Sequence, residues 1–349
     1  MPWANNRAMV KDIDKLPRGA GWTVQSVGIQ GNKGSEFGDL WLRDALEAVK
    51  KLLRNKRLGR FMQFKPIKKW TSPDRTERIR DEIYTADWMW EIQGEIMDEH
   101  GTIIPIIISS DETKLTNFSG DKKAHPVYLT IGNLPKRLRR RTSKGANILL
   151  GYIPVLKYTC ESNLEHRRHH RRNLFHLCIR TMLAPLAKAC EGGVEVPCAD
   201  GKIRRIYPVL AAYVADFPEQ CKIACIKQTH CPLCTVRPDQ KGDLGNAPPR
   251  THDGFVEAVN AHRDTGSARF EQLGLYDVDP FWEDFPYVRV DCLFTPDLLH
   301  QLHKGVIKNH LTKWIIEVLG QDVMNMRHST MPEYHGMRHF KNGITTVSQ

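Results

Sequence analysis

Two apolar runs that each end at an aspartate restrict the folds open to this chain. Ile103–Ser110 (IIPIIISS) reads as a buried strand followed by Asp111, and Tyr207–Ala215 (YPVLAAYVA) reads as another, followed by Asp216, 105 residues after the first acid. Between these runs, residues 125–133 and 148–156 alternate like strands. The helical spacing of Leu174, Leu177, Cys178, Met182 and Leu186, with a bend allowed at Pro185, then predicts a helix.

The predicted order is therefore three strands, a helix and a strand. Short polar or basic loops join the first three strands, which favours an antiparallel meander. Upstream, residues 36–61 carry an amphipathic pattern with a basic tail and predict a helix, as do residues 75–98. Downstream of the linker GDLGNAPPR, a helix is expected over Leu298–Leu319, with Asp297 as its N-cap.

These elements predict an α/β (α+β) protein with four parts. Residues 1–35 are expected to form a poorly ordered N-terminal tail, 36–100 a helical N-terminal region, 101–240 a core of strands around one helix, and 241–349 a linker and a helical insertion. The longest strongly apolar stretch, Ile103–Ile108, is too short to span a bilayer, and the N-terminus has no apolar signal region. We expect a soluble protein with no membrane association.

An excess of basic residues points to a polyanionic partner. The chain has 51 Lys plus Arg against 40 Asp plus Glu, a net charge of +11, and the excess gathers at 51–60, 134–144 and 166–172. The residues expected to contact phosphates are Lys136, Arg137, Arg139, Arg140, Arg141, Arg167, Arg168, Arg171 and Arg172. The run at 136–141 also fits a nuclear-import signal. The helix that carries the basic run 166–172 also contains four histidines. We expect them on its solvated or phosphate-facing surface: His166, His169, His170 and His176.

The two aspartates are the candidate catalytic residues. Phosphodiester cleavage by two divalent cations about 4 Å apart needs bridging carboxylates, which are natural ligands for Mg²⁺. Asp111 and Asp216 end strands that a small sheet can place side by side. Glu112 points to the opposite face from Asp111, because side chains alternate along a strand, so we prefer Asp111.

Cys231 and Cys234 form a C-x2-C pair with the spacing of a zinc site. A zinc site needs two further ligands, and two pairs of residues could supply them. Cys221 and Cys225 would give a local four-thiolate site, whereas His300 and His303, one turn apart on the later helix, would tie that helix to the core. We favour the histidines, because ligation contributes on the order of 10 kcal/mol to folding and would fix the insertion.

Three long stretches resemble the Plavaka transposases of fungal genomes, a branch of the CACTA-like (KDZ) DNA transposons. They are SSDETKLTNFSGDKKAHPVYLTIGNLPK, VADFPEQCKIACIKQTHCPLC and TPDLLHQLHKGVIKNHLTKW, and the resemblance covers residues 36 to 349. It implies an RNase H-like catalytic domain, a metal-dependent cut-and-paste DNA transposase, and action in the nucleus on transposon ends and target DNA, with a possible homo-oligomer and no small-molecule substrate.

The resemblance also assigns residues. Asp111 and Asp216 match the first two acids of the Asp, Asp, Glu/Asp triad that holds Mg²⁺ or Mn²⁺, Cys231 and Cys234 match the cysteine pair after the second acid, and Asp297 with His300 matches the Asp-x-x-His signature, with His303 beside it. The third acid of the family lies in a segment that would follow Gln349, so we expect a truncated or degenerate copy. The alternative is a catalytically inactive, zinc-stabilised DNA-binding relic or domesticated transposase.

Overall fold

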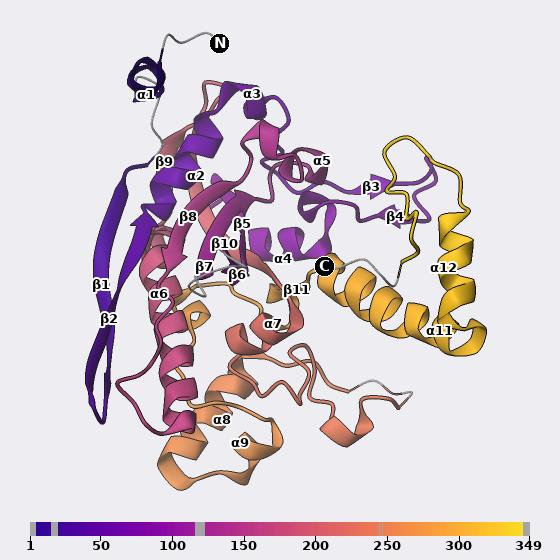
Figure 1. Cartoon of the computed structure of the whole chain (residues 1–349). Coiled ribbons are helices and arrows are strands. Elements are labelled where there is room, and N and C mark those ends of the chain that lie inside the picture. Colours follow the sequence, from indigo (N-terminus) through magenta and orange to yellow (C-terminus); the bar gives the residue numbers. More distant parts are fainter. Residues whose placement is uncertain (1–4, 15–19, 116–122, 244, 246, 345–349) are drawn as a thin grey trace. The chain divides into compact units, whose positions relative to one another are not determined.

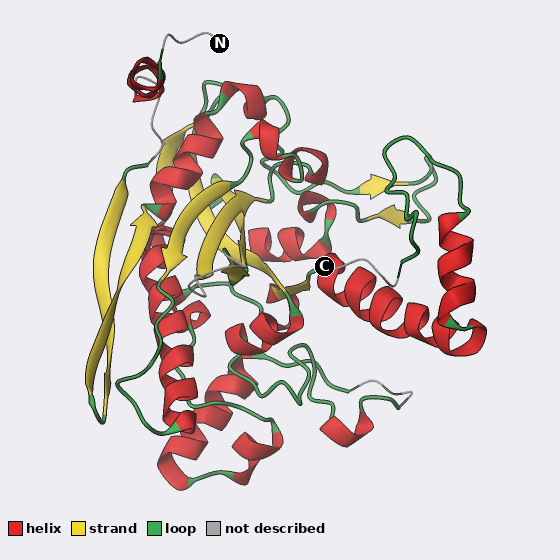
Figure 2. Ribbon diagram, viewed as in Figure 1, coloured by secondary structure: helices red, strands yellow, loops and turns green. Residues whose placement is uncertain are grey.

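The computed structural model describes residues 5–14, 20–115, 123–243, 245 and 247–344. The chain divides into two compact units, Met1–Thr295 and Pro296–Gln349. The first unit combines a mixed β-sheet with helices (Figures 1 and 2), so the α/β class predicted from the sequence is confirmed. The four domain boundaries expected from the sequence stay predictions.

The sheet of the first unit places the predicted strands next to one another. The strand order is β1 (Trp22–Gly31), β2 (Gly34–Arg43), β8 (Ile148–Ile153), β7 (Lys123–Ile131), β5 (Gly101–Ser110), β10 (Ile203–Ala215) and β11 (Phe294–Pro296), while β6 (Thr113–Lys114) pairs with β7 and β9 (Val194–Pro197) with β10. The strands β5, β7 and β8 are antiparallel neighbours, which confirms the predicted meander. The strand β10 runs parallel to β5.

Burial on both faces explains why β5 and β10 read as continuous apolar runs. In β5, Ile104, Ile106 and Ile108 pack into the main core, whereas Ile103 packs into a second, smaller cluster with Met89 and Ile92 of α4 (Asp87–Glu95). All these side chains are fully buried. The two strands that lead to Asp111 and Asp216 therefore lie in the interior, and the site at their ends rests on a rigid base.

The main core is completed by two helices, α2 (Ala45–Arg54) and α6 (Leu164–Gly192), which pack against each other and on the sheet (Figure 1). Asp44 caps α2 through the backbone N–H of Glu47, and Asn163 caps α6 through two backbone N–H groups. The helix predicted around residues 174–186 lies within α6, which also contains Pro185. Its first turns carry the basic run 166–172 to the end of the sheet at which the acids lie.

The N-terminal region differs from the expectation. In place of a tail and a helix over 1–61, the chain forms α1 (Asn6–Asp14) and then the hairpin β1–β2, and α2 begins only at Ala45. The spacing of Leu40 and Leu42 is that of a strand, and both side chains are buried, so they belong to β2 and not to the stripe that continues in α2. The predicted helix 75–98 is likewise shorter: a 3₁₀ turn (Ile83–Thr85) precedes α4, and β3 (Lys69–Trp70) pairs with β4 (Arg78–Ile79).

The remaining helices of the first unit are short, except for α8 with its 14 residues. They are α3 (Lys56–Gly59), α5 (Lys136–Arg139), α7 (Phe217–Ile223), α8 (His252–Thr265), α9 (Ala268–Gln272) and α10 (Val290–Leu293), with 3₁₀ turns at Thr142–Lys144, Pro238–Gln240 and Phe281–Asp284. The helix α7 follows Asp216 directly, and its first turn shapes the site described below.

The second unit is helical. A π-helix (Leu299–Thr312) continues into α11 (Lys313–Leu319), and α12 (Gln321–Ser329) follows. The helix predicted over Leu298–Leu319 is thus present, but its N-cap is Leu298 and not Asp297, whose carboxylate accepts the Leu299 N–H at 2.8 Å. Among the residues that the structure describes, no helix has the length and apolar character needed to cross a bilayer.

Candidate active site

Asp111 and Asp216 lie at the ends of neighbouring parallel strands. Ser109 of β5 pairs with Val214 of β10, and each strand ends one residue later, directly before its aspartate. Adjacent strands are about 4.8 Å apart in the hydrogen-bonding direction, so this register brings the two carboxylates to the same edge of the sheet. Both aspartates line one cavity of about 610 Å³.

The two aspartates have different surroundings. Asp216 is the N-cap of α7, and its Oδ1 accepts the backbone N–H of Glu219 at 3.0 Å. Asp111 is exposed, and its Oδ2 accepts a hydrogen bond from the Thr113 hydroxyl at 3.3 Å. The N-terminus of α7 therefore holds Asp216 in place, whereas Asp111 is exposed to solvent in the cavity. As a donor set they are oxygens of the kind that Mg²⁺ prefers.

A buried carboxylate beneath the aspartates links their two strands. Glu219 of α7 accepts a hydrogen bond from Ser110, the last residue of β5, and lies 3.0 Å from Nε2 of His125 on β7. The Tyr213 hydroxyl of β10 lies 2.7 Å from the same serine oxygen, and Lys222 Nζ is 3.4 Å from the second oxygen of Glu219. The network thus joins β5, β7, β10 and α7 directly below the acid pair.

Glu219 stays ionised within this network. Its burial would raise the pKa, but the hydrogen bond from His125 and the charge of Lys222 outweigh the burial and lower the pKa of Glu219 to about 2. Burial raises the pKa of Tyr213 well above its ordinary value, so this residue remains a neutral donor. Sequence reasoning missed Glu219. A signal existed in the spacing Asp216–Glu219, which has the form of a capping box.

The basic run at the start of α6 lies partly in the acid-lined cavity. Arg168, Arg171 and Arg172 line it together with the aspartates, and the guanidinium of Arg172 stacks 3.6 Å above the ring centroid of Tyr276. Arg167 turns elsewhere and donates to the backbone oxygen of Glu161. Glu112, Glu165, Glu219 and Lys222 line the cavity as well, so it combines carboxylates suited to divalent cations with basic groups suited to a phosphodiester.

The other predicted DNA contacts lie away from the acids. Ser110 pairs with Val127 and Ile106 with Ile131, so the segment after Ile131 leaves the sheet at the opposite end from Asp111. Lys136, Arg137, Arg139, Arg140 and Arg141 all belong to that segment. Several of them make local contacts: Lys136 donates to Asp81 O, Arg139 contacts Glu82 at 3.4 Å, and Arg137 stacks on Phe61.

His176 is not on the solvated helix surface expected for it. It is buried, with Nε2 3.0 Å from the Lys222 backbone oxygen and 3.3 Å from the sulfur of Cys225. The Phe281 N–H donates to its other nitrogen. Burial lowers the pKa of His176 to about 4, so the ring is neutral and serves the core. His166 remains exposed as expected.

The cysteine pair lies in the loop after α7. Cys231 and Cys234 are half-buried, the Leu233 N–H donates to the sulfur of Cys231 at 3.4 Å, and Cys234 forms an isolated β-bridge with Pro249. The buried Arg250 donates to the backbone oxygens of Cys231 and Leu273 and braces this turn.

The two sets of residues expected to complete a zinc site are placed differently. Cys221 is buried, which raises its pKa to about 12, and Cys225 is buried against His176. His300 and His303 belong to the second unit, where His300 Nδ1 contacts the Asp297 carboxylate. Within the described part of the chain, no group of three His, Cys, Asp or Glu side chains is arranged to hold a metal ion. The full ligand set stays a prediction.

A family model described as Plavaka transposase matches residues 3–315. The chain belongs to the Plavaka transposase family. The match spans the hairpin β1–β2, the strands that lead to Asp111 and Asp216, the cysteine pair and His300 with His303. A Plavaka transposase acts on DNA, so DNA is the partner of this chain, in agreement with its net charge of +11. No curated protein matches the chain.

Proposed function

We propose that this Plavaka transposase is a DDE-type, cut-and-paste enzyme of the CACTA-like (KDZ) group from a fungal genome, and that residues 101–240 are an RNase H-like core. The strand order β8-β7-β5-β10 supports the proposal, with an antiparallel meander, a long helix, and a fourth strand parallel to the first. The observation that carries it is the convergence of Asp111 and Asp216 with three arginines in one cavity.

In the proposed mechanism Asp111 and Asp216 would hold Mg²⁺ or Mn²⁺. The bound metal would supply Lewis acidity for an attacking water or 3′ hydroxyl and for the leaving oxygen. Arg168 and Arg171 would bind the phosphates that flank the scissile bond, and Arg172 is oriented by its stacking on Tyr276. Glu219 would keep the two aspartates in register from below, since it bonds to the residue before Asp111 and donates its backbone N–H to Asp216.

We further propose a structural Zn²⁺ held by Cys231 and Cys234 with His300 and His303, with Cys221, Cys225 or Asp297 as alternative ligands. The support is the donor set: two cysteines of one turn, with a backbone N–H donated to the Cys231 sulfur. Nuclear localisation through residues 136–141, binding of transposon ends and target DNA, and assembly into a homo-oligomer complete the proposal.

The test is metal-dependent nicking of supercoiled DNA by the 349-residue chain, by a longer version that carries the third acid expected of the family, and by Asp216→Asn in each. Asparagine is as good an N-cap as aspartate, so this change keeps the start of α7 while it removes the charge needed for the metal. Asp239→Asn, at an exposed acid paired with Arg237, is the matched control. We expect the control to nick with Mg²⁺ or Mn²⁺ and Asp216→Asn to lose at least about a hundredfold in rate.

Salt-sensitive DNA binding without nicking by either wild-type version would refute the enzymatic proposal and leave the alternative, a DNA-binding relic. Equal nicking by wild type and Asp216→Asn would remove Asp216 from the mechanism.

A further inference from the structure

The strand β1 forms one edge of the main sheet. Over its whole length, Trp22–Gly31, one side of β1 is paired with β2, and among the described residues no strand pairs with the other side. Successive residues of a strand direct their N–H and C=O groups to alternate sides, so β1 presents a row of such groups outward. An edge strand of this length is a template for pairing with another strand unless its sequence protects it.

The sequence of β1 lacks the usual protection of an edge. WTVQSVGIQG contains no charged residue and no proline. The other edge strands of the sheet are short, and each contains a charged residue or a proline: Lys114 in β6, Glu195 and Pro197 in β9, and Pro296 in β11. Among these edges, β1 is therefore the one suited to pairing with a further strand.

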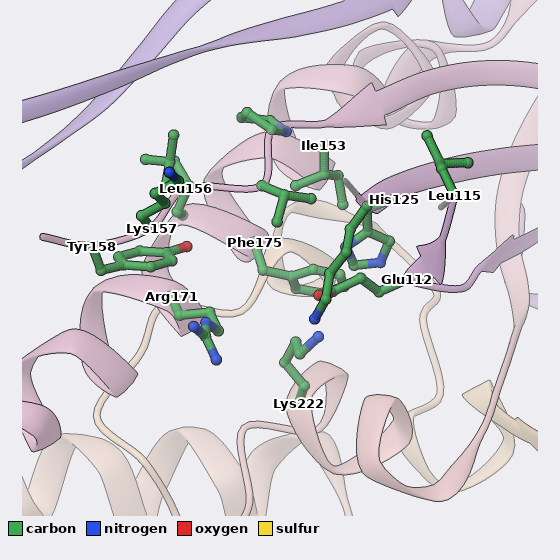
Figure 3. A pocket seen from close by; sticks show the side chains of 14 residues that line it. Glu112, Leu115, His125, Ile153, Leu156, Lys157, Tyr158, Arg171, Phe175 and Lys222 are labelled. Carbon is green, nitrogen blue, oxygen red and sulfur yellow. The ribbon is translucent and has the colours of Figure 1, made fainter. Parts of the chain in front are cut away.

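The hairpin β1–β2 is held from its β2 side, which fixes the position of the free edge. The last residues of β2 pair with β8. Nearer the turn of the hairpin, the Glu36 carboxylate accepts the backbone N–H groups of three successive residues, Lys157–Thr159, at 2.7, 3.1 and 2.8 Å. Figure 3 shows Lys157 and Tyr158 in this segment, where they line a cavity of about 930 Å³. A strand that pairs with β1 therefore meets a preformed edge, which lowers the entropic cost of association.

The charge of the chain indicates which partner fits this edge. Two copies of a chain with a net charge of +11 repel each other, so they can associate only through a surface of low charge. DNA, by contrast, binds where Lys and Arg gather, and none of the three basic runs belongs to β1. A second copy of this chain therefore fits the uncharged edge better than DNA does.

Two copies of β1 are complementary when they pair antiparallel about an axis at Ser26. This register uses nearly the full length of the strand and places Val24 opposite Gly28 of the second copy. Gly28 has no side chain, and the Phe37 ring of β2 covers it, because a Cβ added to Gly28 would lie 2.4 Å from that ring. Val24 and Phe37, which are 47% and 68% exposed, would therefore meet across the interface, and the symmetry forms this contact twice.

We propose that β1 pairs antiparallel with β1 of a second copy, with the twofold axis at Ser26, so that the sheets of two chains become one continuous sheet. This inference rests on the proposed function, since it names the interface of the proposed homo-oligomer.

Sedimentation equilibrium of the full chain, without DNA or metal, tests the interface through the dissociation constant of the dimer. Ser26→Glu places two carboxylates opposite each other and next to Asp39, the cross-strand partner of Ser26. The like charges should raise the dissociation constant at least about tenfold. Gln240→Glu makes the same change of charge at an exposed residue outside the sheet and should dimerise as the wild type does. An equimolar mixture of Ser26→Glu and Ser26→Lys should recover the dimer, because each carboxylate then faces an ammonium group.

A cysteine at the axis tests the register directly. In Ser26→Cys the two thiols would lie opposite each other, at a Cα separation of about 4.5–5.5 Å that a disulfide can span. Mild oxidation should therefore link the two chains of this variant. Gln240→Cys is the matched control and should be linked no more than the wild type, in which Cys292 is already exposed.

A wild type that stays monomeric up to about 100 µM would overturn the interface and leave the proposed DNA chemistry standing, because the nicking assay tests that chemistry separately. A dimer as tight in Ser26→Glu as in the wild type would also overturn the interface, as would a mixture that does not recover the dimer. Linkage of Ser26→Cys no greater than that of Gln240→Cys would overturn the register at Ser26.

Discussion

Replacement of Glu219 by glutamine tests the buried link beneath the acid pair. Glutamine keeps the shape of the side chain and can still accept a hydrogen bond from Ser110, but it removes the charge that His125 and Lys222 face. The pKa of Glu219 falls from 4.5 to about 2 on folding, and at about 1.4 kcal/mol per pKa unit this difference corresponds to about 3 kcal/mol of stability at pH 7.

The same linkage fixes the pH dependence. Because the folded-state pKa lies below the unfolded-state value, the stabilisation is fully present above about pH 4.5 and is lost as the pH falls towards 2. The difference in unfolding free energy between the wild type and Glu219→Gln should therefore be about 3 kcal/mol at pH 7 and about half of that at pH 3.

Urea unfolding followed by tryptophan fluorescence measures both values. Trp282 is buried in the first unit, and its Nε1–H donates to Ile223 O at the end of α7, so it reports on the region of the substitution. Glu165→Gln serves as the control, because Glu165 is an exposed acid of the acid-lined cavity and pairs with Arg168. This substitution should lower the free energy of unfolding by less than about 0.5 kcal/mol. A Glu219→Gln variant within 1 kcal/mol of the wild type at pH 7, or a difference that does not change with pH, would refute the reasoning.

Two other substitutions address the cysteine loop and its support. The purified chain should contain bound zinc by elemental analysis, and Cys231→Ser should lose it while Cys190→Ser, at a buried cysteine outside the loop, keeps it; unchanged zinc in Cys231→Ser would exclude the pair as ligands. Gly274→Ala should lower the free energy of unfolding by about 2 kcal/mol, since Gly274 has a φ of +65° and an added Cβ would lie 2.2 Å from His230 Nδ1, and a variant as stable as the wild type in urea would contradict this.

The central strands could be predicted because their burial leaves a mark in the sequence. β5 and β10 are buried on both faces, so they read as uninterrupted apolar runs, and the acids that end them stand out. The sequence of the hairpin β1–β2 contains no comparable uninterrupted apolar run. Trp22, Phe37 and Trp41 lie on an exposed face, so the apolar residues of this segment do not trace a core stripe.

Asp111 and Asp216 could be paired from the sequence because parallel neighbours end at the same edge. Glu219 could not, because its contacts are remote in sequence: Ser110 is 109 residues away and His125 is 94 residues away. Sequence spacing relates Glu219 only to Asp216, as in a capping box, and does not indicate which side chains a buried carboxylate meets. His176 was misplaced for a similar reason, since its partners Cys225 and Phe281 come from segments far along the chain.

The first two turns of α7 meet several structural demands at once. Asp216 caps the helix and lines the acid cavity, Glu219 forms the buried link to β5 and β7, and Lys222 lines the acid cavity and contacts Glu219 at 3.4 Å. A substitution here is therefore expected to change stability and DNA contacts together, whereas a substitution at exposed Arg168 should change only the salt-dependent affinity. Glu219 is only 6% exposed but lines the acid cavity, so a loss of nicking in Glu219→Gln with unchanged affinity for paired DNA would indicate an effect on the acids and not on binding of the substrate.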